Sequence, residues 1–201
     1  MTKKPLIILG AGEQAKLIAN TCSLQGYKKI QFLDDQQKGN DVIGKLEEID
    51  NFDQQKYDFF VAFGNDDLRK KWFKILQDQK KSCINVIHPK AFLETNVHLG
   101  QNIMIGAFVY VNINTIIEDN VIVNNGCIIE HDNEIGINSQ LAPGVITGGG
   151  VKISSDVFIG MGAVIRDHIN INSQIIVGAG AVVVNNLDES ATYLGIPAQS
   201  K

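Results

Sequence analysis

Residues 124–160 read NNGCIIEHDNEIGINSQLAPGVITGGGVKISSDVFIG, and an aliphatic side chain recurs in them at almost every sixth position. The register continues without an insertion from Leu99 to Val183, and Thr147 is its one polar residue. An amphipathic α-helix does not repeat every six residues over such a length. The period is typical of a parallel β-helix, in which a hexapeptide forms one strand and one turn and three hexapeptides form a coil. The repeated positions are Leu99, Ile105, Val111, Ile117, Val123, Ile129, Ile135, Leu141, Thr147, Ile153, Ile159, Ile165, Ile171, Val177 and Val183.

The residue after each repeated position is often small, as at Gly100, Gly136 and Gly148. We expect such Gly and Asn residues to occupy the corners where the backbone has positive φ. The residue two positions before is also apolar in most hexapeptides, so it is compatible with the interior. Residues 97–186 are therefore expected to form about five coils of a β-helix.

The composition divides along the chain. Residues 1–96 contain 15 of the 18 Lys and Arg residues and 10 of the 14 aromatic residues of this 201-residue chain. Residues 97–201 contain nine acidic residues against three basic ones. This division indicates two architectures, and the formal net charge of −4, with no basic stripe, argues against nucleic acid as a partner. No apolar run is long enough to span a membrane, and no signal-peptide core follows the N-terminus, so we expect a cytoplasmic protein.

The first part alternates short apolar runs with helical patterns, which implies a parallel sheet with helices on its faces. Strands are predicted over residues 6–9, 30–33, 57–63 and 82–87, and helices over residues 14–25 and 66–80. The predicted fold is thus a small Rossmann-like parallel α/β domain at residues 1–87, followed by a left-handed parallel β-helix with a C-terminal tail at residues 88–201.

The first predicted strand ends in Gly10-Ala11-Gly12-Glu13-Gln14-Ala15, which matches the glycine pattern of dinucleotide-binding turns. Asp34 lies 19 residues beyond Ala15, near the spacing of the acidic residue in that pattern. Glycines let a phosphate approach the backbone, and the helix N-terminus offers free N–H groups. The same glycines could merely close a tight turn. A complete NAD site needs more chain than this domain offers, whereas a mononucleotide diphosphate would fit.

The repeat is interrupted at one place. Thr147 is followed by Gly148-Gly149-Gly150, and His131 lies 18 residues before Gly149. One coil separates the two, so the repeat places His131 beside Gly149 on the same wall. A histidine beside a bare backbone N–H combines a general base with an oxyanion donor. The alternative interpretation is a surface histidine among the carboxylates of Glu130 and Asp132.

Other chemistries are less well supported. Offsets from His131 to His88, His98 and His168 are not multiples of 18, so these histidines should not stack with it and no metal is expected. The three cysteines are widely spaced and form no CxxC pair, which fits free thiols in a reducing compartment. Cys127 occupies an inward position and is interpreted as core, not as a nucleophile.

The chain resembles the hexapeptide-repeat acyltransferases, and more closely the PglD-like N-acetyltransferases that act on nucleotide amino sugars of the bacillosamine pathway. Sialic acid O-acetyltransferases are similar as well. The resemblance covers essentially the whole chain. The matching segments are Leu9-Gly10-Ala11-Gly12, Phe32-Leu33-Asp34-Asp35, the run from Tyr57 to Asn65, Glu130-His131-Asp132, the hexapeptide repeat, and Gly195-Ile196-Pro197-Ala198.

This resemblance implies a homotrimer with active sites at subunit interfaces, a UDP-amino-sugar substrate and acetyl-CoA as cosubstrate. It implies His131 as the catalytic base, Asp132 as its supporting acid and the Gly149 N–H as the oxyanion donor. The substrate-binding residues that it implies are Gly10, Ala11, Gly12, Gln14, Asp34, Asp35, Gly64 and Asn65. The acetyl-CoA residues that it implies are Gln140, Met161, Ala179 and Pro197.

The expected function is N-acetylation of the C4 amine of a UDP-linked 4-amino-4,6-dideoxy sugar by direct attack on the thioester. O-acetylation of sialic acid or another sugar is the alternative. An NAD-dependent oxidoreductase and a non-catalytic scaffold that binds sugar nucleotides also remain open.

Overall fold

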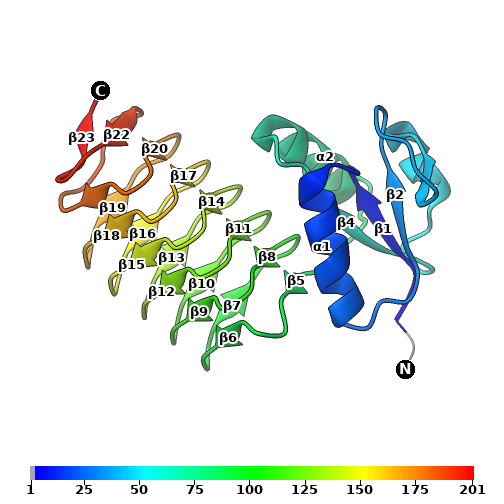
Figure 1. The fold of residues 1–201 in the computed structure, drawn as a ribbon, viewed down its shortest axis with the longest axis horizontal. Helices are drawn as coiled ribbons and strands as arrows, with labels where there is room; N and C mark the ends of the chain where they lie inside the picture. The colour runs from blue at the N-terminus through cyan, green and yellow to red at the C-terminus, as the bar shows by residue number, and fades with distance from the viewer. Residues whose placement is uncertain (1–2) are drawn as a thin grey trace. The chain divides into compact units, whose positions relative to one another are not determined.

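The computed structural model describes residues 3–201, which form two compact units that divide between Pro89 and Lys90. Each unit has its own architecture, as Figure 1 shows: a small sheet with helices, and a long coil of short strands. No helix among the described residues is long and apolar enough to cross a membrane.

The first unit is a four-stranded parallel sheet in the order β3-β2-β1-β4. The predictions for the first two strands and both helices are confirmed to within two residues. The elements are β1 (Leu6–Leu9), α1 (Glu13–Leu24), β2 (Ile30–Leu33), β3 (Val42–Gly44), the 3-10 helix η1 (Leu46–Asn51), β4 (Asp58–Val61), α2 (Asp66–Asp78) and β5 (Val86–Ile87).

The strand predicted over residues 82–87 is present only in part. Cys83 forms an isolated parallel bridge with Phe59 of β4, and the strand β5 covers Val86–Ile87 alone. The fourth strand of the sheet is instead β3, on the opposite edge. Its sequence, Val-Ile-Gly, follows a polar loop and is only three residues long, so it carries no periodic signal.

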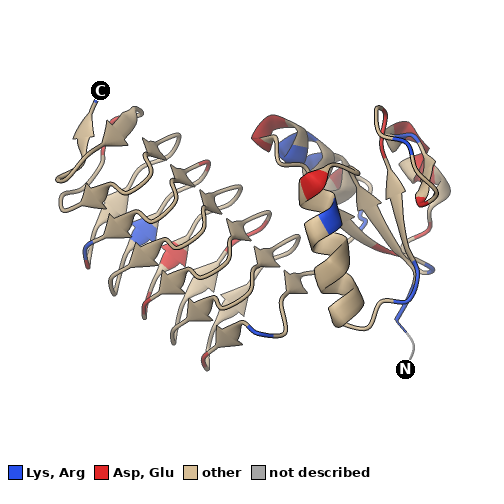
Figure 2. Ribbon diagram, viewed as in Figure 1, with Lys and Arg blue, Asp and Glu red and all other residues tan. Residues whose placement is uncertain are grey.

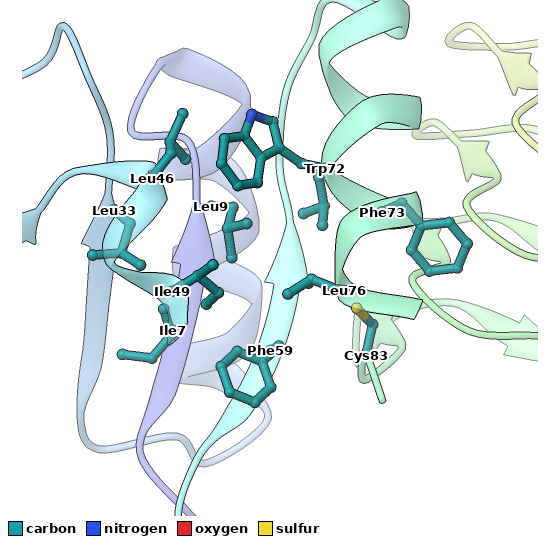
Figure 3. Packing of buried hydrophobic residues seen from close by; sticks show 11 residues of the cluster. Ile7, Leu9, Leu33, Leu46, Ile49, Phe59, Trp72, Phe73, Leu76 and Cys83 are labelled. Atoms are coloured by element: carbon teal, nitrogen blue, oxygen red, sulfur yellow. The ribbon is translucent and has the colours of Figure 1, made fainter. Parts of the chain in front are cut away.

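The core of the first unit lies between the sheet and α2, as the close view in Figure 3 shows. Trp72, Phe73 and Leu76 of α2 belong to one cluster of buried side chains with Leu9 of β1 and Phe59 of β4. Complete burial of a side chain such as Leu or Phe contributes about 1.5–3 kcal/mol. This packing fixes the ends of β1 and β4, from which the glycine-rich turn and Gly64 emerge.

The second unit is a parallel β-helix with three walls, and the predicted coil of 18 residues is confirmed by the strand pairing. Ile117, for example, is in register with Ile135, and Ile135 with Ile153. Sheet I contains β7 (His98–Leu99), β10 (Ile116–Ile117), β13 (Glu134–Ile135), β16 (Lys152–Ile153) and β19 (Asn170–Ile171). Sheet II contains β8 (Met104–Ile105), β11 (Ile122–Val123), β14 (Gln140–Leu141), β17 (Phe158–Ile159), β20 (Ile176–Val177), β22 (Thr192–Leu194) and β23 (Gln199–Ser200). Sheet III contains β6 (Phe92–Leu93), β9 (Tyr110–Val111), β12 (Ile128–Ile129), β15 (Ile146–Thr147), β18 (Val164–Ile165) and β21 (Val182–Val183).

The coil extends beyond the predicted residues 97–186 at both ends. β6 at Phe92–Leu93 already pairs with β9, and β22 at Thr192–Leu194 pairs with β20. β22 then turns back to pair antiparallel with β23, which forms a small hairpin at the end of the coil. Figure 2 shows how few charged residues the strands of the coil carry; Glu134 and Lys152, on neighbouring strands of sheet I, form an ion pair of 2.8 Å.

The corners differ from the prediction in one respect. The backbone has positive φ three residues before each repeated aliphatic position, not one residue after it. The residues after the aliphatic positions are small for a steric reason. A Cβ added at Gly136 would lie 2.6 Å from the backbone of Ser154, and one added at Gly160 would lie 2.5 Å from Ala179 N. The positive-φ residues are Asn96, Asn102, Phe108, Asn114, Asn120, Gly126, Asp132, Asn138, Gly144, Gly150, Asp156, Gly162, His168, Gln174 and Gly180.

Candidate active site

His131 and Asp132 lie at the corner where the chain passes from sheet III to sheet I, called here the III–I corner. His131 Nδ1 is 2.7 Å from Asp132 Oδ2, and about half of each side chain is exposed. A carboxylate that accepts from Nδ1–H leaves Nε2 as the basic nitrogen of a neutral imidazole. Asp132 therefore holds the imidazole so that Nε2 can accept a proton from a ligand.

Asp132 is held in turn by the preceding coil. Its other oxygen, Oδ1, accepts a hydrogen bond of 3.0 Å from Asn114 Nδ2. The hydrogen bond from His131, that from Asn114 and the charges of His131 and His168 together keep the pKa of Asp132 below its ordinary value. Asp132 thus stays a carboxylate at neutral pH, as a partner of the histidine requires.

Gly149 lies directly beside the imidazole, one coil further on, and the predicted proximity of these two residues is confirmed. A Cβ added at Gly149 would lie 2.6 Å from both Nε2 and Cε1 of His131. The backbones of the two corners are also tied together, because Gly150 N–H donates to His131 O at 2.9 Å. The Gly149 N–H forms no hydrogen bond to any residue within 3–201, so it is available as a donor beside Nε2.

His168 belongs to the same corner, which sequence reasoning missed. It lies two coils beyond Asp132, and Gly150 occupies the position between them. A Cβ added at Gly150 would lie 2.5 Å from His168 Nδ1, so the absence of a side chain at Gly150 makes room for this ring. The sequence does contain a signal for this position. His168 lies 36 residues after Asp132, which is two whole coils of 18 residues.

Cys127 is unsuited to nucleophilic attack. It is fully buried, and its thiol contacts Ala142 O at 3.2 Å. Burial raises the pKa of the Cys127 thiol to about 11. Within residues 3–201, no group of three or more His, Cys, Asp and Glu side chains is placed to hold a metal ion.

The residues expected to bind the nucleotide surround a cavity of about 280 Å³ in the first unit. Five of the eight line it, namely Gly12, Gln14, Asp34, Asp35 and Gly64. Sequence reasoning missed several of the other lining residues, of which Lys71 and Trp72 come from α2 and Phe63 from the segment after β4. Lys71 is a cation at the cavity that could meet a phosphate. The sequence predicts only a helix at this segment and assigns it no part in binding.

The remaining three predicted residues have structural partners. Ala11 N–H donates to Asp34 Oδ2 at 2.8 Å, and Asn65 Oδ1 accepts from Leu68 N–H at 2.9 Å as the N-cap of α2. Gly10 has φ +97°, a backbone conformation that side chains rarely adopt, and is buried in the turn. These residues therefore shape the cavity without lining it.

Asp34 acts as an anchor between the glycine-rich turn and the loop after β2. Besides Ala11 N–H, it accepts hydrogen bonds of 2.8 Å from the N–H groups of Gln36 and Gln37. Partial burial raises the pKa of Asp34, but the three N–H donors outweigh it and the net pKa is lowered. Asp35 is similarly engaged, because its Oδ1 accepts from Leu46 N–H at 3.0 Å.

The Asp34→Asn variant is expected to be less stable than the wild type at pH 7, because an amide cannot accept all three N–H bonds. A lowered folded-state pKa adds stability above the ordinary value near 3.8, and this stability is lost as the pH falls through the lowered value. The difference in thermal midpoint should therefore shrink from pH 7 to pH 3. Asp41→Asn, an exposed change in the same loop, is the control. An Asp34→Asn difference that is equal at both pH values would contradict this assignment.

The expected acetyl-CoA residues divide into three places in the second unit. Met161 and Ala179 occupy adjacent coils of one corner, where sheet II passes into sheet III, and Gly180 N–H donates to Met161 O at 2.8 Å. Gln140 is half-buried on the outer face of β14, between Ile122 and Phe158. Pro197 lies in the turn between β22 and β23, and the following Ala198 N–H donates to Val182 O at 2.8 Å.

Comparison with known proteins places this geometry in a class. Residues 5–76 match the PglD N-terminal domain family. The chain is 31% identical over 115 residues to the GDP-perosamine N-acetyltransferase of Escherichia coli O157:H7, a match that covers 57% of this chain and 52% of that protein. The chain thus spans about half or less of the length of the curated relatives that it matches.

Solved structures match along nearly the whole chain. PerB from Caulobacter crescentus, in complex with CoA and GDP-perosamine, superposes with a TM-score of 0.92 at 31% identity, covering 98% of this chain and 97% of PerB. The acetyltransferase domain of PglB from Neisseria gonorrhoeae, in complex with acetyl coenzyme A, gives a TM-score of 0.95 at 28% identity, covering 99% and 100%. The two-unit fold and these similarities place the chain in the class of hexapeptide-repeat acetyltransferases. Within that class, the chain belongs to the PglD-like family.

Proposed function

We propose that this protein transfers the acetyl group of acetyl-CoA to the amine of a nucleotide-linked amino sugar. The observation that carries the proposal is the III–I corner, where the His131–Asp132 pair lies beside the free Gly149 N–H. The comparisons support both substrates, since PerB was solved with CoA and GDP-perosamine and the PglB domain with acetyl coenzyme A.

The proposed mechanism needs no covalent acyl-enzyme. The sugar amine attacks the thioester carbonyl carbon while His131 Nε2 accepts a proton from the nitrogen. The Gly149 N–H stabilises the oxyanion of the tetrahedral intermediate. The carbon–sulfur bond then breaks, and the protonated imidazole returns the proton to the CoA thiolate. Asp132, ionised because of its lowered pKa, orients the ring and stabilises the imidazolium.

The proposed acceptor is a UDP-linked 4-amino-4,6-dideoxy sugar whose nucleotide occupies the cavity of the first unit. The match to the PglD N-terminal domain supports a sugar nucleotide at this domain. Gly12, Gln14 and Gly64 would lie along the nucleotide, and Lys71 would meet the diphosphate. A GDP-linked amino sugar is the alternative, because the relatives above are named for GDP-perosamine.

Acetyl-CoA is proposed to lie along the corner from sheet II to sheet III, past Met161 and Ala179. From the second coil onward, this corner has glycine at every positive-φ position, whereas Asn and Asp fill most of those positions at the other two corners. A Cβ added at Gly126, Gly162 or Gly180 would meet nothing within 4 Å, so packing within the chain does not explain these glycines. A bare backbone edge suits an extended ligand with amide groups of its own.

A homotrimer is proposed because sheet III exposes an unbroken apolar column. Its outward side chains are in register along the sheet, and four of them are 37–59% exposed. The outward side chains of sheet I are largely polar, as at Glu134 and Lys152. This column, bordered by the corner of His131 on one side and that of Met161 on the other, would be buried between copies of the chain. The column consists of Phe92, Tyr110, Ile128, Ile146, Val164 and Val182.

The Ile146→Lys variant is expected to dissociate the trimer, because a charge in the middle of the buried column cannot be paired there. Acetyl transfer should fall with the loss of assembly. Sedimentation velocity measures the change against the 22.0 kDa chain. Asn170→Lys, an exposed change on sheet I, should remain trimeric. A wild-type protein that sediments as a monomer, or an Ile146→Lys trimer, would contradict the proposal.

The test of the reaction is CoA release from acetyl-CoA with a panel of acceptors: UDP- and GDP-linked 4-amino sugars, their 4-hydroxy counterparts, and sialic acid. The expected result is release with an amino sugar and an N-acetylated product by mass spectrometry. Turnover with hydroxyl acceptors alone would favour an O-acetyltransferase. NAD binding by calorimetry would favour an oxidoreductase, and nucleotide binding without any turnover would favour a scaffold.

The proposed compartment is the cytoplasm. All three cysteines are buried free thiols, which fits a reducing environment. Mass-spectrometric detection of the protein in a cytoplasmic fraction would test this, and its recovery from an oxidising compartment would contradict it.

A further inference from the structure

The interior of the coil contains a small polar patch. At the two inward positions of each hexapeptide between residues 97 and 183, namely the repeated position and the one two residues before it, the side chains are apolar with four exceptions that carry a hydroxyl or an amide. These are Thr115, Asn133, Ser139 and Thr147, and each is fully buried. Burying such a group is unfavourable unless its hydrogen bonds are satisfied, so each one needs a partner inside the coil.

Three of these four side chains converge on the backbone of one corner. Thr115 Oγ1 donates to Glu130 O at 3.2 Å, and Thr147 Oγ1 accepts from Glu130 N–H at 3.3 Å. Asn133 Nδ2 lies 2.8 Å from Glu130 O and 3.2 Å from His131 O. The patch therefore lies directly beneath the backbone that carries His131. Ser139 serves a different corner, where its hydroxyl donates to Ser154 O.

Asn133 contacts backbone carbonyls of two neighbouring coils at this corner. Besides the two carbonyls of its own coil, its Nδ2 donates to Gly148 O at 2.9 Å. One side-chain amide thus contacts the carbonyl of His131 and the carbonyl one residue before Gly149. Its Oδ1 is buried with no hydrogen-bond partner among the described residues. An aliphatic residue, as at Val151 and Val157, would fill the interior without that unsatisfied oxygen.

We infer that Asn133 is a positioning residue: its amide holds the His131 backbone against Gly149 and so sets the distance from the imidazole to the Gly149 N–H. This inference rests on the proposed function, in which those two groups act on one substrate. Small displacements of reacting groups reduce turnover far more than they reduce ligand binding. Asn133 touches neither substrate, and its contribution is to kcat.

The test compares Asn133→Leu with Ser139→Val. Both changes replace a buried polar side chain by an aliphatic one in the same interior, but only Asn133 contacts the His131 corner. Asn133→Leu should lower kcat for acetyl transfer by about 10- to 100-fold, with KM for both substrates within about twofold of wild type. Ser139→Val should keep kcat. If Asn133→Leu does not fold, Asn133→Ser, which retains a shorter donor, takes its place.

A second measurement separates this inference from the proposed function. The imidazole Cε1–H resonance of His131, followed by NMR without substrates, should shift in Asn133→Leu and remain in place in Ser139→Val. His98, on the outer face of β7, is the internal reference. An inactive wild-type protein would reject the proposed function, while the His131 resonance would still decide the positioning role. Unchanged kcat together with an unchanged His131 resonance overturns the inference.

Discussion

Replacing His131 with glutamine should lower kcat for acetyl transfer by about 10²- to 10⁴-fold, the range that a positioned general base contributes. Glutamine keeps a polar side chain at the corner but cannot accept and return a proton. His131 is half exposed, and among residues 3–201 its ring forms a side-chain hydrogen bond with Asp132 alone, so the variant should fold normally. KM for acetyl-CoA should change little, because the histidine acts on the acceptor amine.

The matched control is His98→Gln, since His98 is exposed on the outer face of sheet I and belongs to no proposed site. The assay is CoA release with the best acceptor of the panel, together with thermal unfolding to verify the fold. Full activity of His131→Gln would refute the assignment of the base. Equal losses in both variants would indicate a general effect of histidine replacement.

Gly149→Ala should reduce kcat by about 10- to 100-fold without loss of thermal stability. The new methyl group would lie 2.6 Å from two ring atoms of His131, so the imidazole must rotate away from Asp132. Gly149 does not have positive φ, so alanine can adopt its backbone conformation. A glycine-to-alanine change in compatible backbone even stabilises by about 0.4–1 kcal/mol. The Gly149→Ala variant should therefore lose activity while it keeps its thermal stability.

A double variant tests whether the methyl group acts through the imidazole. In a His131→Ala background there is no ring to displace, so adding Gly149→Ala should cause no further loss. Such non-additivity is expected of residues in direct contact. If Gly149→Ala reduces residual turnover equally in both backgrounds, its effect lies elsewhere, for instance on the backbone N–H itself.

The coil could be predicted almost entirely from the sequence, because nearly every hexapeptide carries an aliphatic residue at the same position. The spacing of 18 residues also predicts that His131 lies beside Gly149. The short edge strand β3 could not be predicted, since three residues after a polar loop carry no periodic signal. The prediction that the glycines after the aliphatic positions have positive φ is wrong. A close backbone approach and positive φ both favour glycine, and sequence alone does not separate the two causes.

The candidate site could be predicted only where the 18-residue period relates its residues. Residues that contact one another across coils, such as Asn114 and Asp132, follow from the period once one member is known. The cavity of the first unit has no such rule. Lys71 and Trp72 line it because α2 presents them beside the turn. Asp34 also lines it, but its carboxylate accepts three backbone N–H hydrogen bonds. Those features depend on three-dimensional packing that no local pattern encodes.

The 18-residue period also makes catalytic distances discrete. Neighbouring coils are separated by one strand spacing, about 4.8 Å, which the backbone hydrogen bonds impose. Groups on the same corner can therefore be separated only by whole multiples of this coil spacing. His131 and Gly149 are one coil spacing apart, and Asp132 and His168 are two. Evolution cannot adjust such a spacing gradually by inserting single residues. It can only exchange side chains at fixed steps, or gain and lose entire coils.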